Sequence, residues 1–319
     1  MAALVFLMVI VGGATRLTDS GLSITEWKPL LGAIPPLNEA DWLDAFTKYQ
    51  TIPQYQILNK GMTLADFKFI YWWEWSHRFL GRFIGFAFAI PFLFFVATRR
   101  IAKSLWPRLV LLFLLGGAQG ALGWYMVASG LVDRTDVSQY RLAAHLTLAI
   151  ALFAAIVWTA LEVSGVRGAI TRGRGPAIVL IPLLFLQIAA GGFVAGLDAG
   201  HVSDTWPLMD GALIPSGLAF MQPIWKNLFE NALTAQFDHR FLAYVIVFIV
   251  AVQAYIARTA SAWIVLAAAL AQATLGIITI VTHVPLHAAL THQAGALIFL
   301  SLALWHLKRV TPSLVPNQR

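Results

Sequence analysis

Residues 74–100 read EWSHRFLGRFIGFAFAIPFLFFVATRR, and this stretch decides how the rest of the chain is interpreted. It begins with a histidine-containing motif, continues as a largely apolar run over Phe79–Ala97 and ends with two arginines. A helix needs about 20 apolar residues to cross the hydrocarbon core of a bilayer. The run therefore predicts a transmembrane helix with a histidine at one end and basic residues at the other.

The composition of the whole chain is that of a membrane protein. Of its 319 residues 59% are hydrophobic and 12% charged, and the mean hydropathy is +0.74, which is too apolar for a soluble globular domain. Seven further apolar runs are Ala2–Ala14, Leu105–Gly130, Leu142–Leu161, Ala177–Leu197, Phe241–Ala257, Trp263–Val281 and Ala288–Leu307. We therefore expect an all-α integral membrane protein with eight transmembrane helices. The short first run is interpreted as a span, because no basic leader of a signal peptide precedes it.

Basic residues in the short connections indicate how the spans are oriented. They gather after every second run, at Arg99, Arg100, Lys103, Arg108, Arg167, Arg172, Arg174, Arg258, Lys308 and Arg309. Loops rich in Lys and Arg stay on the cytoplasmic side, so both termini are expected there, or on the matrix side in an organelle. The net charge of +7 is thus a topology signal, and no nucleic-acid binding is expected. The long connections, residues 16–76 and 198–238, then lie outside, the first with a short amphipathic helix at Glu39–Tyr49.

The two halves of the chain repeat each other. Seven residues of the first half recur at an offset of 179: Gly12, Gly13, Asp19, Gly21, Trp27, Gly32 and Ala33 match Gly191, Gly192, Asp198, Gly200, Trp206, Gly211 and Ala212. The tetrapeptide at 77–80 recurs at 239–242, residues 118–123 resemble 271–276, and His145 matches His292. Four spans per half keep both halves in the same orientation. We predict two pseudo-twofold-related four-helix bundles, residues 1–165 and 166–319.

Four of the eight histidines occupy equivalent places in this repeat. His77 and His239, and likewise His145 and His292, stand at the starts of even-numbered spans, so all four lie at a similar depth near the outer face. Ionisable side chains in membrane spans are costly and mark functional sites. Imidazoles from facing helices, one on each side of a planar macrocycle, form the axial pair of a heme. Zinc would need three or four ligands per site, and the chain has no Cys, so we predict two bis-histidine heme sites.

Other polar residues near the outer level are weaker candidates. Arg78 and Arg240 directly follow predicted ligands, and guanidinium groups hold carboxylates such as heme propionates bidentately. Snorkelling to the interface is the alternative for each arginine. Further arginines at this level are Arg16, Arg134 and Arg141, and histidines not expected to bind iron are His201, His283, His287 and His306.

The places where the halves differ indicate where chemistry occurs. Glu74 lies three residues, or one helical turn, before His77, and the residue at the same distance before His239 is Gln236. A carboxylate can transfer protons or stabilise positive charge, and an amide can only form hydrogen bonds. The alternative is that Glu74 orients His77 or faces water. Because the first outer connection is also longer by 17 residues, we predict that the first half is the reactive site.

The chain strongly resembles the heme A synthase family over essentially its whole length. The segments that carry the resemblance are GGATRLTDSGLSITEWKPLLGAIPP, EWSHRFLGR, LGGAQGALGWYMVASGL, QYRLAAHLTLA, AGGFVAGLDAG, DHRFLAY, ATLGIITIVTHV and THQAGAL. Part of the family carries a cysteine pair in an outer loop, and this chain has no cysteine, which excludes a thiol-dependent mechanism here.

The resemblance implies an enzyme that oxidises the C8 methyl group of heme O to a formyl group, giving heme A for cytochrome oxidase. It implies a resident heme b on His239 and His292, and heme O between His77 and His145, with Glu74 as the family's carboxylate. Successive hydroxylations followed by loss of water account for the oxidation. The expected partners are heme O, delivered by heme O synthase, an electron-transfer protein or quinone, the bilayer and a second copy in a homo-oligomer. The expected location is the bacterial cytoplasmic membrane or the mitochondrial inner membrane.

Two other classes of protein are compatible with parts of the pattern. A diheme b-type electron-transfer cytochrome would use the same four histidines without a substrate and would hold two permanent hemes. A parallel-repeat transporter would need a polar site at the midplane and broken helices, and the polar residues there are mostly Gln119, Gln187 and Gln272.

Overall fold

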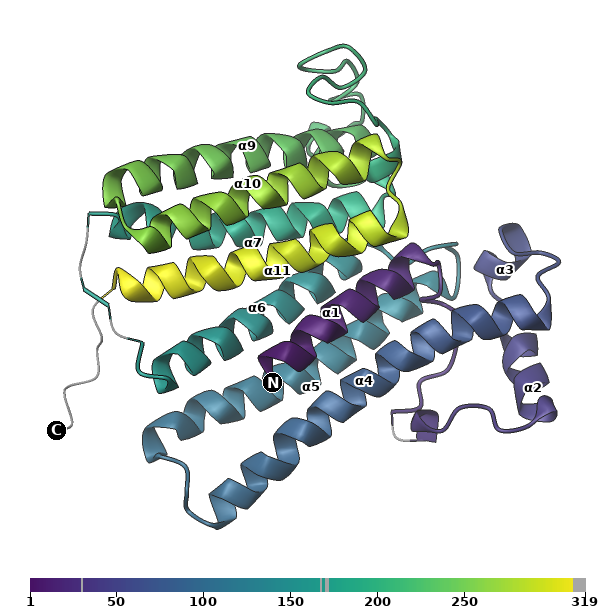
Figure 1. The fold of residues 1–319 in the computed structure, drawn as a ribbon. Helices are drawn as coiled ribbons and strands as arrows, with labels where there is room; N and C mark the ends of the chain where they lie inside the picture. Colours follow the sequence, from purple (N-terminus) through teal and green to yellow (C-terminus); the bar gives the residue numbers. More distant parts are fainter. Residues whose placement is uncertain (30, 167, 170–171, 312–319) are drawn as a thin grey trace. The chain divides into compact units, whose positions relative to one another are not determined.

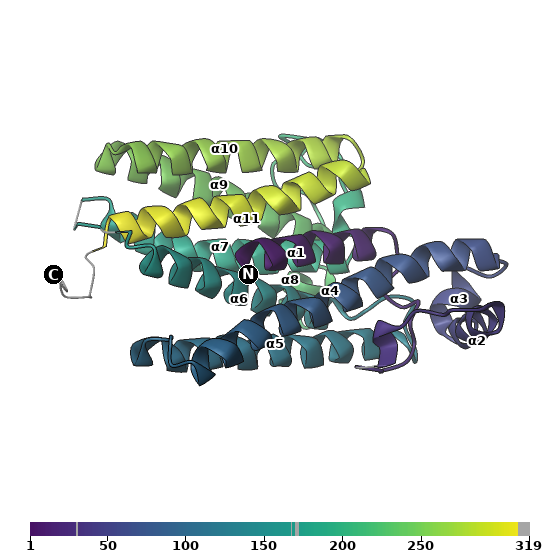
Figure 2. The same ribbon diagram turned by 60° about the horizontal axis from the view of Figure 1, so that its bottom comes forward.

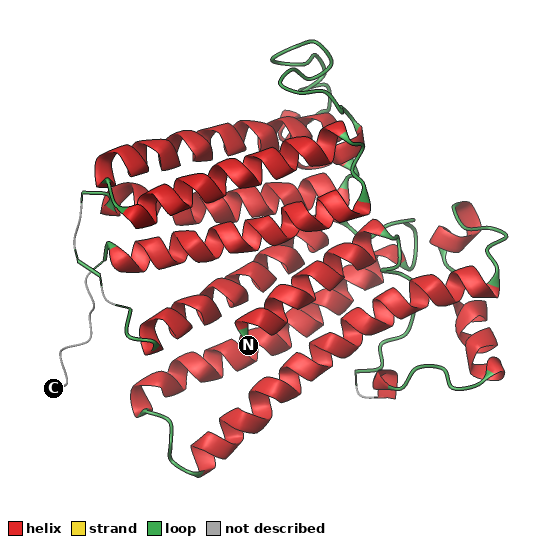
Figure 3. Cartoon of the chain, in the orientation of Figure 1, coloured by secondary structure: helices red, strands yellow, loops and turns green. Residues whose placement is uncertain are grey.

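The computed structural model describes residues 1–29, 31–166, 168–169 and 172–311. Arg167 of the basic connection lies outside the described residues. Within them the regular structure is helical apart from one isolated β-bridge between Met209 and Ala212, as Figure 3 shows. The helices are α1 (Ala2–Leu17), α2 (Glu39–Tyr49), α3 (Pro53–Ile57), α4 (Leu64–Ala97), α5 (Trp106–Val127), α6 (Gln139–Val163), α7 (Arg174–Gly196), α8 (Asn227–Glu230), α9 (Ala232–Ala257), α10 (Ala260–Val281) and α11 (Leu286–Arg309). Short 3-10 turns lie at Leu31–Ala33, Lys103–Leu105, Ala128–Gly130, Ala199–His201 and Ile224–Lys226.

Seven of the described helices are long and apolar enough to cross a membrane. They are α4, α5, α6, α7, α9, α10 and α11. The prediction of an all-helical membrane protein is therefore confirmed. Helix α1 has 16 residues, and at about 1.5 Å per residue it is shorter than the ~30 Å hydrocarbon core. The eighth span stays a prediction.

Helix α4 begins at Leu64, far before the apolar run predicted from Phe79. The predicted start was wrong as a helix boundary, because hydropathy detects only the part of a helix that is suited to lipid. The true start is fixed by a capping box, in which the Thr63 side chain accepts from the Asp66 N–H and Asp66 accepts from the Thr63 N–H. In the same way α6, α9 and α11 begin before His145, His239 and His292.

The chain divides into two compact units, Met1–Leu152 and Phe153–Arg319. In the first unit α1 packs on α4, and α4 on α5. In the second unit α7, α9, α10 and α11 form a closed ring, in which each helix packs on two others. Figures 1 and 2 both show α10 alongside α9 and α11. The division between the units falls within α6, after Leu152. The predicted functional boundary at residue 165 lies just beyond the end of that helix and stays a prediction.

The extra length of the first unit forms a small folded region next to the start of α4. Helix α2 has the predicted bounds, Glu39–Tyr49, and Asn38 caps it by accepting from the Asp41 N–H. Its buried residues Trp42 and Tyr49 join Phe67 and Tyr71 of α4 in an aromatic cluster. This packing fixes α2 against the N-terminal part of α4.

The repeat is visible in the backbone as well as in the sequence. Asp19 follows the end of α1 with a φ of 52°, and Asp198 follows the end of α7 with a φ of 50°. Few residues other than glycine adopt this left-handed conformation, and Asp is one of them. Each half therefore leaves its first helix through the same turn.

Candidate functional site

Each of the four predicted iron ligands packs against a glycine of a neighbouring helix. The pairs are His77 with Gly12, His145 with Gly123, His239 with Gly191, and His292 with Gly276. A β-carbon on these glycines would lie 3.0, 2.9, 3.1 and 2.9 Å from the imidazole ring, which is closer than ordinary packing permits. The glycines matched by the repeat thus make room for the rings. The same glycine and histidine contact is built four times.

In the second unit the two imidazoles are spaced as a pair of axial ligands would be. The ring centroids of His239 and His292 lie 6.5 Å apart, with the planes at 80°. A metal–imidazole bond is about 2 Å long and the ring centre lies about 1 Å further, so two rings on opposite sides of one ion have centroids about 6 Å apart. His77 and His145 both belong to the first unit.

Sets of three or more ligands are absent from the part of the chain that the structure describes. No three His, Cys, Asp or Glu side chains come together there in a group that could hold a metal ion. A zinc-type site is therefore not formed by these residues. Two imidazoles at this separation suit a metal whose other ligands come from a macrocycle, as in heme.

Three of the four imidazoles are also contacted by a glutamine. The amide nitrogen Nε2 lies 3.1 Å from Nδ1 of the ring in Gln119–His145 and Gln272–His292, and 3.2 Å in Gln187–His239. In the pairs of Gln119 and Gln187 it also lies 3.4 and 3.3 Å from ring Nε2. Each amide also donates to the backbone carbonyl of its histidine, at 2.9 to 3.0 Å. The sequence had identified these glutamines only as midplane polar residues. The signal that could have found them is the spacing Gln-x-x-x-Gly. It occurs three times, and each time its glycine is the one that packs on a histidine ring.

Glu74 is buried and holds the long connection between α1 and α4. Only 2% of the surface of Glu74 is exposed. One oxygen accepts from Ser23 Oγ at 2.8 Å and from the Ile24 N–H at 2.7 Å. The other accepts from Nε and Nη2 of Arg78, at 3.0 and 2.6 Å. The interpretation that Glu74 faces interfacial water is therefore wrong.

Arg78 and Arg240 tie equivalent loop carbonyls to their helices. Arg78 donates to the carbonyls of Ile24 and Glu26, at 2.7 and 3.0 Å. Arg240 donates to the carbonyls of Ser203 and Thr205, at 2.9 and 2.8 Å, which are the positions related to 24 and 26 by the repeat offset. Gln236 donates to the Ser203 carbonyl at 2.9 Å, where Glu74 instead accepts from loop donors. Both guanidinium groups are thus engaged by protein, and their binding to propionates stays a prediction.

Comparison with known proteins places the chain in a family. The family model described as cytochrome oxidase assembly protein matches residues 1–304. The chain belongs to the cytochrome oxidase assembly family. Relatives named heme A synthase include those of Parvibaculum lavamentivorans, 54% identical over 317 residues, and Azorhizobium caulinodans, 56% identical over 316 residues. The matches cover 97% and 96% of this chain, and 92% and 90% of the relatives. The resemblance found from the motifs is confirmed.

In this member of the cytochrome oxidase assembly family, the remaining candidate residues have ordinary structural partners. Arg16 pairs with Asp19 at 3.0 Å and with Asp136 at 3.5 Å. Arg134 donates to Gln139, and Arg141 donates to the Tyr125 carbonyl. His283 lies 3.2 Å from Asp204, and His306 is buried with Nδ1 2.8 Å from Ser261 Oγ. His201 and His287 are exposed.

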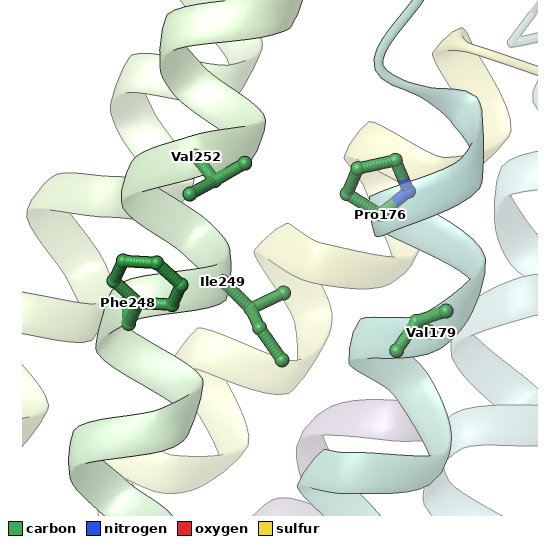
Figure 4. Close-up of a pocket in the computed structure, with 5 residues that line it drawn as sticks. All are labelled: Pro176, Val179, Phe248, Ile249 and Val252. Atoms are coloured by element: carbon green, nitrogen blue, oxygen red, sulfur yellow. The ribbon is translucent and has the colours of Figure 1, made fainter.

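An apolar pocket of about 270 Å³ lies between α7 and α9, away from the histidines. Figure 4 shows its lining, Pro176 and Val179 from α7 facing Phe248, Ile249 and Val252 from α9. These residues lie near the start of α7 and in the later half of α9, whereas Gly191 and His239 lie toward the opposite ends of the same helices. The lining offers no iron ligand, so the pocket is separate from the candidate heme site.

Proposed function

We propose that this protein is a heme A synthase, a membrane oxidoreductase that oxidises the C8 methyl group of heme O to a formyl group and provides heme A for cytochrome oxidase. The observation that carries the proposal is the spacing of His239 and His292, which suits two axial ligands of one iron ion. It occurs in a chain more than half identical to proteins named heme A synthase.

Within this proposal the two halves have different tasks. Residues 166–319 hold a resident heme b on His239 and His292, and residues 1–165 take the substrate heme O between His77 and His145. Bound heme b supplies one-electron redox chemistry. The packing of each ring on its glycine supports this assignment, because it holds the imidazoles at fixed places along their helices.

The oxidation removes four electrons from the methyl carbon. Two successive hydroxylations followed by loss of water give the aldehyde, so an external electron-transfer partner, a protein or a quinone, completes the reaction. Among the described residues, no cluster of three potential metal ligands offers a second redox metal site. The chain's own contribution is to hold the substrate heme with its reacting edge near the outer connection.

Glu74 is proposed as the carboxylate that serves the first site. It lies one turn before His77, and both its oxygens already accept hydrogen bonds. This bonding favours electrostatic stabilisation of positive charge at the porphyrin edge over proton transfer. Together with Arg78, Glu74 also holds residues 23–26 in place.

The proposed setting is a multi-pass protein of the bacterial cytoplasmic membrane, or of the mitochondrial inner membrane in a eukaryote. Helix α1 is the proposed eighth span, which puts both termini on the cytoplasmic or matrix side and completes two four-helix bundles. It is apolar over most of its length and carries Gly12 against His77. The proposed partners are heme O synthase as the source of substrate and a second copy of the chain.

Expression in cells that make heme O but lack their own heme A synthase tests the proposal. We expect heme A in the extracted heme, and heme O alone would contradict it. The purified protein should hold close to one tightly bound heme b with variable heme O or heme A. Two permanent hemes b would instead indicate an electron-transfer cytochrome.

Substitution of single ligands separates the two sites. His239→Ala or His292→Ala should abolish the low-spin heme b spectrum, because one axial bond is lost. His77→Ala should leave that spectrum largely intact while heme A output collapses, since His77 belongs to the other unit and substitutions that share no partners act nearly independently. Equal loss of heme b in both sets would contradict the division of tasks.

A further inference from the structure

The glutamine contacts are present at three of the four imidazoles, and the exception is His77. The residue one turn before the contacting glycine is Gln119, Gln187 or Gln272 at the other three rings, and it is Met8 before Gly12. Among the described residues, the ring of His77 has no hydrogen-bond partner, from an amide or otherwise. Met8 instead packs its terminal carbon close to Gly81, one turn beyond His77.

The three glutamines share a second feature, which is an unpaired buried oxygen. Oε1 of Gln119, Gln187 and Gln272 is buried and has no hydrogen-bond partner among the described residues. Buried carbonyl oxygens are nearly always paired, so each exception calls for a reason. In Gln272 this oxygen occupies the space that a β-carbon on Gly295 would need, so Gly295 makes room for the amide on α11.

Iron binding explains why an amide suits this place. An imidazole that binds a metal through Nε2 keeps its proton on Nδ1, and this N–H almost always donates to an acceptor. A glutamine amide carries a donor and an acceptor on one planar group. It can donate to Nδ1 of a free imidazole. Accepting from Nδ1–H of a metal-bound one requires a half-turn of the amide, which gives up the bond from Nε2 to the carbonyl of the same histidine. Methionine offers only a weak sulfur acceptor.

We propose that Gln119, Gln187 and Gln272 are positioning residues that fix three iron-binding imidazoles, and that His77, for which Met8 stands at the glutamine position, is the ligand left free to exchange. The proposal rests on the proposed function in one respect, namely that the four imidazoles bind heme iron. A resident heme is then held on both sides by oriented, strongly donating ligands. A substrate heme is held firmly by His145 and loosely by His77, which lets it enter and leave.

Paired variants at Gln187 test the positioning role through the midpoint potential of heme b in the purified protein. Gln187→Met removes the acceptor for Nδ1–H, so the ligand donates less electron density and the potential should rise. Gln187→Glu supplies a stronger acceptor, so the potential should fall. Both variants lose the bond to the His239 carbonyl, and they differ in the acceptor at Nδ1 and in the charge of the new side chain. The same pair at Gln272 should behave alike.

The outcomes of this measurement are distinct. Shifts of opposite sign support the proposal, as does loss of heme b from Gln187→Met alone. Unchanged potentials, shifts of the same sign, or loss of heme b from both variants would overturn it, because the bond to the backbone carbonyl would then be what matters.

Exchange at His77 is tested with Met8→Gln, and Met8→Leu is its control. Purified protein loaded with ferric heme O is mixed with excess apomyoglobin, and the heme O transferred is extracted and quantified over time. Partners of metal-bound histidines typically change affinity 10–100-fold, so release from Met8→Gln should be slower by about that factor. Met8→Leu should release heme O as the unmodified protein does. Equal release rates in the two variants would overturn the assignment of His77.

Failure of this inference can be told apart from failure of the proposed function. If the unmodified protein makes heme A while potentials and release rates do not respond, only the positioning role is wrong. If the protein binds both hemes and responds as expected but makes no heme A, the proposed oxidation is wrong and the roles of the glutamines remain.

Discussion

The position of each imidazole is set by the glycine opposite its ring. Gly191 on α7 would carry a β-carbon 3.1 Å from the His239 ring, whereas a β-carbon on Gly175 of the same helix would meet nothing within 4 Å. The two positions therefore separate the effect of crowding from the ordinary effect of replacing glycine in a helix, which is stabilising by about 0.5–1 kcal/mol.

Gly191→Ala should displace the His239 ring and weaken the binding of heme b. Overpacking at a closely fitted place costs about 1–3 kcal/mol. The measurement is heme b content and the low-spin spectrum of purified protein, with Gly175→Ala as the control that should keep both. On α5, Gly123→Ala and Gly120→Ala form an equivalent pair for the first site, since Gly120 also faces open space. Full heme b content in Gly191→Ala would show that the ring can move aside.

The buried ion pair of Glu74 and Arg78 gives the second prediction at this scale. Glu74→Gln copies Gln236 of the second half, keeps the shape of the side chain and removes its charge. If the charge stabilises the porphyrin edge, a loss of about 2.7–4 kcal/mol of transition-state stabilisation slows turnover roughly a hundredfold or more. The extracted heme should then contain heme O or a hydroxylated intermediate, with heme b unchanged.

Glu26→Gln is the matched control for the Glu74 variant. Glu26 pairs with Lys28 and Lys48 at 2.9 and 3.0 Å, but its side chain is 44% exposed, and exposed ion pairs contribute about 0–1 kcal/mol. Heme A output should be normal in this variant. Normal output from Glu74→Gln at equal protein abundance would show that Glu74 only holds the loop.

At the scale of elements, the sequence predicted which segments are helices better than where they begin. The apolar runs located all seven long helices, because the bilayer imposes length and hydropathy together. The start of α4 was missed although Thr63 and Asp66 have the spacing of a capping box. The contacts of Gln187 with His239 were missed for another reason. The available signal was the Gln-x-x-x-Gly spacing, and it indicates a contact with His239 only once Gly191 is known to pack on that ring.

The outer connections should depend on the arginines that hold them. Arg240→Ala removes the donors to the carbonyls of Ser203 and Thr205, and an unpaired buried polar group costs about 1–3 kcal/mol. Hydrogen exchange measured by mass spectrometry should become faster in residues 200–210 and stay unchanged in α10. The control is Arg258→Ala, because the Arg258 side chain at the far end of α9 donates to the Tyr255 carbonyl and lies over the Tyr255 ring. An unchanged rate of hydrogen exchange in residues 200–210 would show that contacts other than those of Arg240 fix this loop.

For the whole molecule, the repeat in the sequence predicted the features that the two halves share. The structure adds the features in which they differ. The four contacts between histidine and glycine and the two arginine-bound loops are common to both halves. The differences are Glu74 against Gln236, Met8 against Gln187, and the added region with α2. In each case the first unit carries the feature that the second lacks: a carboxylate, a methionine in place of the glutamine, or an added segment. This is the distribution expected if one half changes its ligand and the other keeps it.

The absence of cysteine from the chain gives a direct test of how it crosses the membrane, because any single introduced cysteine is a unique label. Helix α1 is the open point, since its 16 residues are few for a span. In intact cells, an impermeant maleimide should label Gly61→Cys and Ser216→Cys, in the outer connections, but not Lys103→Cys. All three positions are exposed in the structure. If α1 crosses, Ala3→Cys should react only after the membrane is opened, as Lys103→Cys does. Labelling of Ala3→Cys in intact cells would leave seven spans with α1 on the outer side, and the paired four-helix architecture would have to be abandoned while the histidine contacts stood.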